Sequence, residues 1–177
     1  MDELLNNYRQ LVARIDALCR GIVEVLGDQI TCTEGCSACC TAITLFPVEA
    51  AALAAALDEL PEGEAEAIRG RVAEHAEGER CPLLHNDVCL LYGARPIICR
   101  THGFPIIYGA GKERRIDYCP RNLSDCESIP GSVIIDVDNL NSLLVAVNAL
   151  FLSKSDVLDM PERITIAEAL LKRPAPR

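Results

Sequence analysis

The chain has 177 residues, half of them hydrophobic, and a formal net charge of −9. This length and hydrophobicity are sufficient for a folded core and argue against intrinsic disorder. The negative charge disfavours nucleic acid and anionic membrane surfaces as partners. Residues 1–7 lack the basic and apolar features of a signal peptide, and no apolar run is long enough to cross a bilayer. We therefore expect a cytoplasmic protein that binds neither nucleic acid nor membrane.

The first half of the chain predicts three helices. Residues 3–26 form an amphipathic helix, because apolar residues recur three and four positions apart. These residues are Leu4, Tyr8, Leu11, Ile15, Leu18, Ile22 and Val25. Residues 47–59 predict a second helix with Pro47 in its first turn. Residues 64–77, charged and rich in alanine, predict a more exposed third helix.

The second half predicts hairpins and then helices. Residues 81–84 and 88–91 flank a turn at 85–87, and residues 104–108 and 113–118 flank a glycine-rich turn. Residues 138–153 predict a helix capped by Asp136 or Asp138, with Leu140, Leu143, Leu144, Val147, Leu150 and Phe151 on one face. A shorter helix at 163–172 precedes a proline-rich tail at 174–177. The predicted fold is mainly α with small β-hairpins, a single compact helical domain over 1–177 with a cysteine-rich metal-binding region at 30–126.

Four of the ten cysteines fall within nine residues: Cys32, Cys36, Cys39 and Cys40. Thiolates this close together can converge on a soft metal ion or an iron–sulfur cluster. In a reducing cytosol, such a pattern favours metal binding over a framework of disulfides. Cys19 lies alone in the first predicted helix, where we expect a small buried hydrophobic residue rather than a ligand.

Three interpretations of the thiols remain open from the spacing. An iron–sulfur cluster is suggested by Cys81 and Cys119, each followed by proline as in a bacterial ferredoxin ligand run. Structural zinc is suggested by the pair Cys36-x2-Cys39. Thiol chemistry without metal is suggested by the adjacent Cys39 and Cys40, which could form a reducible disulfide, but it leaves the other thiols without a role.

The order of these motifs resembles the YkgJ-like cysteine-cluster family of zinc- or iron-chelating domains. The resemblance rests on Cys32-x3-Cys36-x2-Cys39-Cys40, Cys81-Pro82-Leu83-Leu84, Cys89-Leu90-Leu91-Tyr92, Arg95-Pro96-Ile97-Ile98-Cys99-Arg100 and Cys119-Pro120. It implies a metal-site set of Cys32, Cys36, Cys39, Cys40, Cys81, Cys89, Cys99 and Cys119. It does not extend to Cys19 or Cys126. Flagellin lysine methylases carry a similar pattern associated with an iron–sulfur cluster, which favours a 4Fe-4S cluster over Zn²⁺ as the cofactor.

Three further residues are candidates for contact with the cofactor. Arg95 and Arg100 flank Cys99 and could neutralise an anionic thiolate–metal centre, although an ordinary ion pair with an acidic residue is the alternative. His102 is a candidate ligand or neighbour of the cluster. The expected function is a metal-binding protein with an iron–sulfur cluster in a redox or substrate-modifying role. The alternative is a zinc-binding structural or interaction module, or a metal carrier, with a protein partner.

Overall fold

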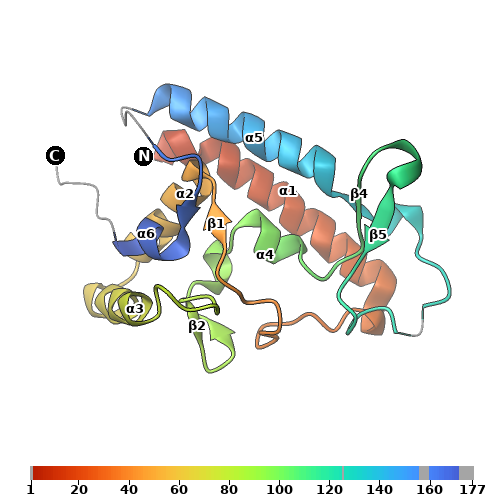
Figure 1. Ribbon diagram of the computed structural model, residues 1–177, viewed down its shortest axis with the longest axis horizontal. Coiled ribbons are helices and arrows are strands. Elements are labelled where there is room, and N and C mark those ends of the chain that lie inside the picture. Colours follow the sequence, from red (N-terminus) through yellow and green to blue (C-terminus); the bar gives the residue numbers. More distant parts are fainter. Residues whose placement is uncertain (1, 125, 156–159, 172–177) are drawn as a thin grey trace. The chain divides into compact units, whose positions relative to one another are not determined.

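The computed structural model describes residues 2–124, 126–155 and 160–171. Its α-helices are α1 (Asp2–Leu26), α2 (Pro47–Asp58), α3 (Glu62–Glu74), α4 (Ile97–Thr101), α5 (Val137–Lys154) and α6 (Ile166–Leu171). The strands, of two or three residues each, form small sheets, and four 3₁₀ turns connect the elements at Gly27–Gln29, Tyr92–Ala94, Gly111–Glu113 and Gly131–Val133. The predicted mainly α class with small hairpins is confirmed (Figure 1).

The chain forms two compact units, each built from segments distant in sequence. The first unit contains the chain up to Leu5, Glu34–Pro96, and the chain from Leu150 onward. The second contains Asn6–Thr33 and Ile97–Ala149. The boundary at Thr33 and Glu34 therefore divides the four-cysteine loop, leaving Cys32 in the second unit. The single-domain organisation stays a prediction.

The core of the first unit lies among α2, α3 and α6. An antiparallel strand pair, β1 (Thr44–Leu45) with β7 (Ile164–Thr165), leads into α2 and α6. The core consists of aliphatic side chains from these elements and from the hairpin region: Leu45, Ala50, Leu53, Leu57, Ala65, Ile68, Val72, Leu83, Leu91, Ile166, Ala167 and Leu170. Burying this apolar surface is the main force that holds the unit together. The helices predicted at 47–59 and 64–77 are both present.

Local hydrogen bonds explain where these helices begin. Pro47 occupies the first turn of α2, and the Glu49 carboxylate accepts the Phe46 backbone N–H at 3.2 Å. At α6, the Thr165 hydroxyl accepts the Glu168 N–H at 3.1 Å while the Glu168 carboxylate accepts the Thr165 N–H at 3.0 Å. This reciprocal arrangement is a capping box, which satisfies backbone donors that the helix leaves unpaired.

The first predicted hairpin is also present in this unit. Strands β2 (Leu84–His85) and β3 (Val88–Cys89) pair antiparallel. Asn86 and Asp87 form the turn with φ values of 49° and 63°, a left-handed conformation that Asn and Asp tolerate. Cys81 and Cys89 pack against the core of the unit. The hydrophobic core therefore anchors the segment that carries these two thiols.

The second unit combines α4, most of α1 and α5, and a three-stranded sheet. Strand β4 (Ile106–Tyr108) pairs antiparallel with β5 (Arg115–Asp117), as predicted, and parallel with β6 (Ile135–Asp136), which the sequence did not predict. Buried side chains come from all these parts and include Tyr8, Leu11, Ile15, Ile22, Ile97, Phe104, Ile135, Leu140 and Leu144. The Asp136 carboxylate accepts the Asn139 N–H at 3.0 Å, which confirms the predicted cap of α5.

The predicted apolar faces were wider than the real ones. Leu18 and Val25 of α1 are 41% and 62% exposed, and Leu143 of α5 is 48% exposed. Spacings of three and four accumulate angular error along a helix, so the outermost apolar positions rotate out of the buried stripe. Helix α4 was not predicted, because five residues are too few for a helical period to show. The predicted tail at 174–177 lies outside the described residues.

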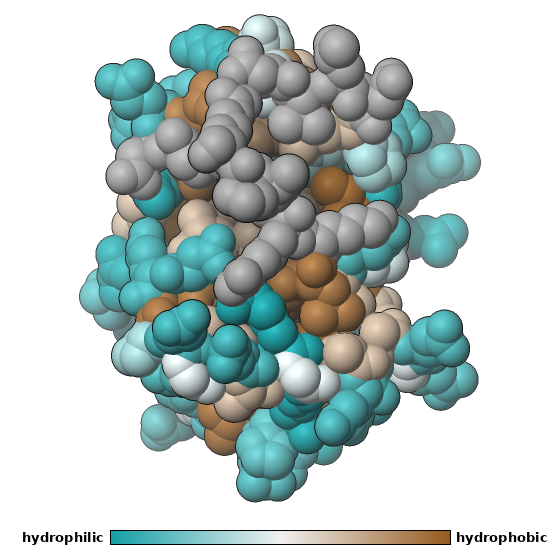
Figure 2. All heavy atoms as spheres, turned by 90° about the vertical axis from the view of Figure 1, so that its left-hand side faces the viewer, coloured by the Kyte–Doolittle hydropathy of each residue, from teal (hydrophilic) through white to brown (hydrophobic). Residues whose placement is uncertain are grey.

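Hydrophilic side chains cover much of the face drawn in Figure 2, with hydrophobic atoms between them. This agrees with the acidic composition of the chain. Among the described helices, none is long and apolar enough to span a membrane.

Candidate metal centre

All ten cysteines lie in the described residues, and none of them is joined in a disulfide. The predicted eight metal-site cysteines divide between the two units. Five lie in the first unit, namely Cys36, Cys39, Cys40, Cys81 and Cys89, and three lie in the second, namely Cys32, Cys99 and Cys119.

Backbone pairing places Cys40 beside Cys81. The Cys81 N–H donates to the Cys40 carbonyl oxygen at 3.2 Å, and the Ala42 N–H donates to the Glu79 carbonyl oxygen at 2.8 Å. Thr41 and Arg80 form an antiparallel bridge between these bonds. The end of the four-cysteine loop is therefore held against the segment that enters the first hairpin, 40 positions further along the chain.

The hairpin then returns the chain so that Cys89 lies near the segment that carries Cys81. Cys89 is the register partner of Leu84, and the Leu90 N–H donates to the Leu83 carbonyl oxygen at 2.9 Å. A turn closed by the Leu84 N–H and the Cys81 carbonyl oxygen, at 3.0 Å, connects Cys81 to the hairpin. Three thiols from three separate stretches of sequence are thus gathered by main-chain hydrogen bonds.

The three thiols also interact electrostatically. Burial, followed by negative charge on Cys89 and Cys40, raises the pKa of Cys81 to about 11. Burial, and then charge on Cys89, raises the pKa of Cys40. Cys40, Cys81 and Cys89 are therefore coupled pair by pair. A nearby cation would favour the thiolate form of all three.

Two of these thiols, Cys81 and Cys89, accept backbone hydrogen bonds that favour the thiolate. The N–H groups of Leu83 and Leu84 donate to Cys81 and lower its pKa against the larger effect of burial. For Cys89, burial raises the pKa and the N–H of Leu91 lowers it. Such N–H groups form a small anion-binding turn around each sulfur. The backbone N–H groups favour the thiolate forms of Cys81 and Cys89, whereas burial disfavours them. A bound cation would compensate for the effect of burial.

Cys36 and Cys39 extend the group through Cys40. Besides burial and Cys89, the pKa of Cys40 is lowered by Arg80 and by a hydrogen bond with the Cys39 side chain, and raised by Cys36. Cys36 is half-buried, whereas Cys39 is exposed. Cys40 is thus coupled to every other cysteine of this unit, and Cys39 is the outermost of them.

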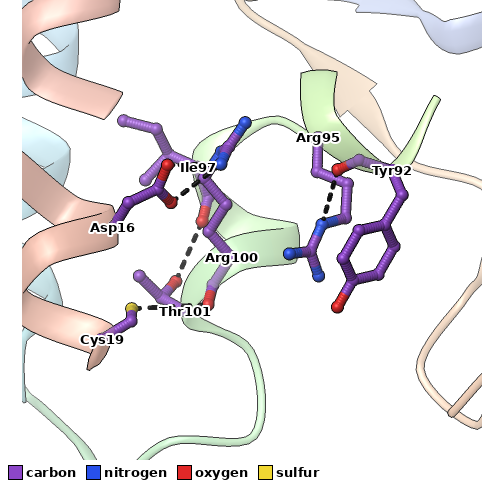
Figure 3. Close-up of polar contacts among 7 residues, drawn as sticks. All are labelled: Asp16, Cys19, Tyr92, Arg95, Ile97, Arg100 and Thr101. Carbon is purple, nitrogen blue, oxygen red and sulfur yellow. Dashed lines mark hydrogen bonds and ion pairs between the residues drawn. The ribbon is translucent and has the colours of Figure 1, made fainter. Parts of the chain in front are cut away.

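Arg95 acts electrostatically on one of these thiols. Its guanidinium stacks on the Tyr92 ring at 3.5 Å from the centroid, and its Nε donates to the Tyr92 carbonyl oxygen at 3.0 Å (Figure 3). Burial raises the pKa of Cys89, and the Arg95 charge counteracts this, while Glu34 adds to it. Arg95 therefore supplies positive charge at Cys89. Contact of Arg95 with a cofactor stays a prediction.

Arg100, in the second unit, has a different partner. Its Nη1 donates to both carboxylate oxygens of Asp16 at 2.8 Å, and its side chain is only 8% exposed (Figure 3). This is the ion pair that the sequence left as the alternative. The Cys19 thiol donates to the Arg100 carbonyl oxygen at 3.6 Å. His102 is exposed, and its backbone N–H donates to the Ile98 carbonyl oxygen at 2.9 Å. Contact of Arg100 or His102 with a cofactor stays a prediction.

In the second unit, Cys32 and Cys119 both lie beside Gly103. Gly103 has a φ of +97°, and a Cβ there would lie 2.6 Å from the Cys32 Sγ and 3.5 Å from the Cys119 Cβ. The Cys119 N–H donates to the Gly103 carbonyl oxygen at 3.3 Å. The Asn122 side-chain Nδ2 donates to the Cys32 Sγ at 3.3 Å. Sequence reasoning missed both Gly103 and Asn122, since neither residue carries a recognisable metal-ligand pattern.

The chemistry of the donor set fits zinc or iron. The described residues contain no group of three or more His, Cys, Asp or Glu side chains already placed to hold a metal ion. The coupled thiols nevertheless supply sulfur donors, which suit zinc and iron–sulfur clusters. In the second unit, the lack of a side chain at Gly103 leaves room for the Cys32 sulfur beside Cys119.

Comparison with known proteins assigns the chain to a family. Neither the curated proteins nor the solved structures give a match. A family model, CxxCxxCC, described as "Putative zinc- or iron-chelating domain", matches residues 31–122, which is more than half of the chain. The matched span includes all eight cysteines predicted as the metal-site set. The protein belongs to the CxxCxxCC family of zinc- or iron-chelating domains.

Proposed function

We propose that the protein holds a cysteine-ligated iron–sulfur cluster, with Cys36, Cys40, Cys81 and Cys89 as its ligands in the first unit. The observation that carries this proposal is the mutual coupling of Cys40, Cys81 and Cys89. Cys36 is the fourth ligand because it is coupled to Cys40 and half-buried, whereas the exposed Cys39 acts on Cys40 through a hydrogen bond.

The surroundings of these thiols support an anionic cluster. Four cysteine thiolates are the usual ligands of a 4Fe-4S cluster, and hydrogen bonds to the sulfurs adjust its reduction potential. Here the N–H groups of Leu83, Leu84 and Leu91 donate to sulfur, and Arg80 and Arg95 supply positive charge. When bound, the cluster would supply one-electron chemistry. The chain would bind it, neutralise part of its charge and limit its contact with water through the packing of Cys81 and Cys89.

Zinc is the second candidate, because Cys36 and Cys39 have the two-residue spacing of a zinc knuckle. Four thiolates would complete a tetrahedral site and make the domain a structural or interaction module. The exposed position of Cys39 also suits a metal carrier, since an accessible thiol beside the ligands can begin ligand exchange with a partner protein. In that case the protein would bind the metal reversibly and perform no catalysis.

Cys32, Cys99 and Cys119 complete the proposed metal-site set in the second unit. Cys99 is half-buried within α4, and Cys32 and Cys119 both lie beside Gly103. We place the protein in a reducing cytoplasm, where ten thiols persist without disulfides. A protein partner that receives electrons or metal is consistent with either candidate.

The test is to purify the protein without oxygen, record its visible spectrum, and measure iron, zinc and acid-labile sulfide. We expect brown protein with near-equal iron and sulfide. Colourless protein with stoichiometric zinc would replace the cluster with the second candidate. Protein without bound zinc or iron, even after reconstitution with iron and sulfide or with zinc, would contradict both.

A further inference from the structure

We propose that Asn122 is a positioning residue that orients the Cys32 thiolate for metal binding and stabilises its charge. This inference rests on the proposed role of Cys32 as a metal-site thiol. Asn122 is 1% exposed, so its amide must find all its partners within the protein.

The amide of Asn122 uses its complete hydrogen-bonding capacity. Its Oδ1 accepts the backbone N–H of Thr31 at 2.9 Å and the Thr31 hydroxyl at 3.0 Å. Its Nδ2 donates to the Gly103 carbonyl oxygen at 2.7 Å and to the Cys32 Sγ at 3.3 Å. An asparagine amide has two donors and two acceptor positions, and all four are occupied here.

This network fixes which way the amide faces. Turning the amide over would aim its oxygen at the Gly103 carbonyl oxygen and the Cys32 sulfur, and would leave the Thr31 N–H without its acceptor. The N–H directed at sulfur is therefore held in place by three other hydrogen bonds. A buried donor fixed in this way would stabilise the negative charge that the Cys32 sulfur carries as a metal ligand, and it adds no charge of its own.

The network also joins the two ends of the family segment. Thr31 and Asn122 are the first and last residues of the span matched by the family model. The Arg121 carbonyl oxygen, at 3.2 Å, is a second acceptor within reach of the single Thr31 hydroxyl proton, and the Leu123 N–H donates to the Gln29 carbonyl oxygen at 2.9 Å. The backbone that precedes Cys32 is thus held against the backbone on both sides of Asn122. Asn122 sets both the position and the electrostatic environment of the Cys32 sulfur.

The inference predicts an effect on the metal beyond any effect on folding. Outer-sphere partners of metal ligands typically contribute about 10–100-fold to metal affinity. Asn122→Asp keeps an acceptor for Thr31 but replaces the N–H donor with a carboxylate oxygen beside the sulfur. Asn122→Ala removes the donor without adding charge. Asn148→Asp is the matched control, because Asn148 is another buried asparagine of the same unit, 8% exposed and located on α5.

The experiment measures metal affinity by competition with a chelator, the midpoint potential of any bound cluster, and urea unfolding of each variant. Both Asn122 variants should bind metal at the thiols of the second unit about 10–100-fold more weakly, and a cluster held there should have a lower midpoint potential, with a larger decrease for Asn122→Asp. Asn148→Asp should change the unfolding only. Metal affinity and potential equal to the wild type in Asn122→Ala would overturn this inference and leave the proposed function intact. A wild-type protein that binds no metal would overturn both.

Discussion

The Cys81 backbone N–H donates to the Cys40 carbonyl oxygen at 3.2 Å. This bond joins the four-cysteine loop to the segment that enters the first hairpin. It explains why Cys40, the last cysteine of a loop with little burial, lies near Cys81 and Cys89, which pack against a hydrophobic core. The thiol group of the first unit therefore depends on both the main-chain pairing and the core behind it.

The two adjacent cysteines of the loop should differ in importance. Cys40→Ser should lose most of the bound metal, because Cys40 is coupled to Cys36, Cys81 and Cys89. Cys39→Ser should retain the metal, because Cys39 is exposed and acts through Cys40. Metal content per protein, measured after gel filtration, checks this.

Cys19→Ser is the control for loss of a thiol outside the proposed set, and it should bind metal like the wild type. Equal metal loss in Cys39→Ser and Cys40→Ser would show that the two cysteines are not distinguished as we propose. Full metal content in Cys40→Ser would remove Cys40 from the ligand set.

Arg95 and Arg100 should have separable effects. Arg95→Gln removes positive charge beside Cys89 and should weaken metal binding or lower the potential of a bound cluster. Arg100→Gln breaks a nearly buried ion pair with Asp16 and should destabilise the fold by about 1–3 kcal/mol. Metal affinity and urea unfolding, measured for both variants, separate the two roles. A loss of metal affinity in Arg100→Gln at unchanged stability would instead support the role predicted from sequence.

Gly103→Ala should damage the site in the second unit. A Cβ at this position would lie 2.6 Å from the Cys32 sulfur, and the φ of +97° is unfavourable for alanine. Gly111→Ala is the control, since Gly111 has a φ of +56° but no atom within 4 Å of a Cβ. We expect Gly103→Ala to lose metal and stability, and Gly111→Ala to show only the cost of the left-handed conformation, about 1–2 kcal/mol. Equal losses in the two variants would mean that the contact with Cys32 is unimportant.

The stability of the metal-free protein should fall at high pH. Burial raises the pKa of Cys81 from 9.0 to about 11. Between these values the unfolded chain has released the proton while the folded protein still holds it, so stability decreases as pH rises. Urea unfolding between pH 8 and 10.5, with reductant and chelator present, should show this decrease, and Cys81→Ala should make it shallower.

The control for that experiment is Cys126→Ala, which removes a thiol that donates to the Ser128 carbonyl oxygen at 3.1 Å. It should leave the pH dependence close to that of the wild type. The same slope in the wild type and in Cys81→Ala would contradict the assigned burial of Cys81.

The local elements could be predicted from the sequence because their signals are local. Pro47 in the first turn of α2, Asp136 at the cap of α5 and the Asn86-Asp87 turn each act on neighbouring residues. Strand β6 could not be predicted, because two residues carry no period and their pairing with β4 depends on packing between distant segments.

The candidate metal-site cysteines could likewise be identified from the sequence. Which of them lie together in the fold could not. Spacing alone cannot show that Cys32 folds with a different unit from Cys36, four positions away. Nor can it show that Cys40 meets Cys81 through a backbone bond, or that Asn122 reaches Cys32 across 90 positions. These relationships come from tertiary pairing, which leaves no periodic trace in the sequence.

The central claim is that sulfur atoms alone hold the metal. X-ray absorption at the iron or zinc edge of protein purified without oxygen tests it most directly. We predict a first shell of sulfur only, at the distances of metal–thiolate or metal–sulfide bonds, with an iron–iron shell if a cluster is present. A first shell dominated by nitrogen or oxygen would contradict the assignment of the cysteines as the metal ligands.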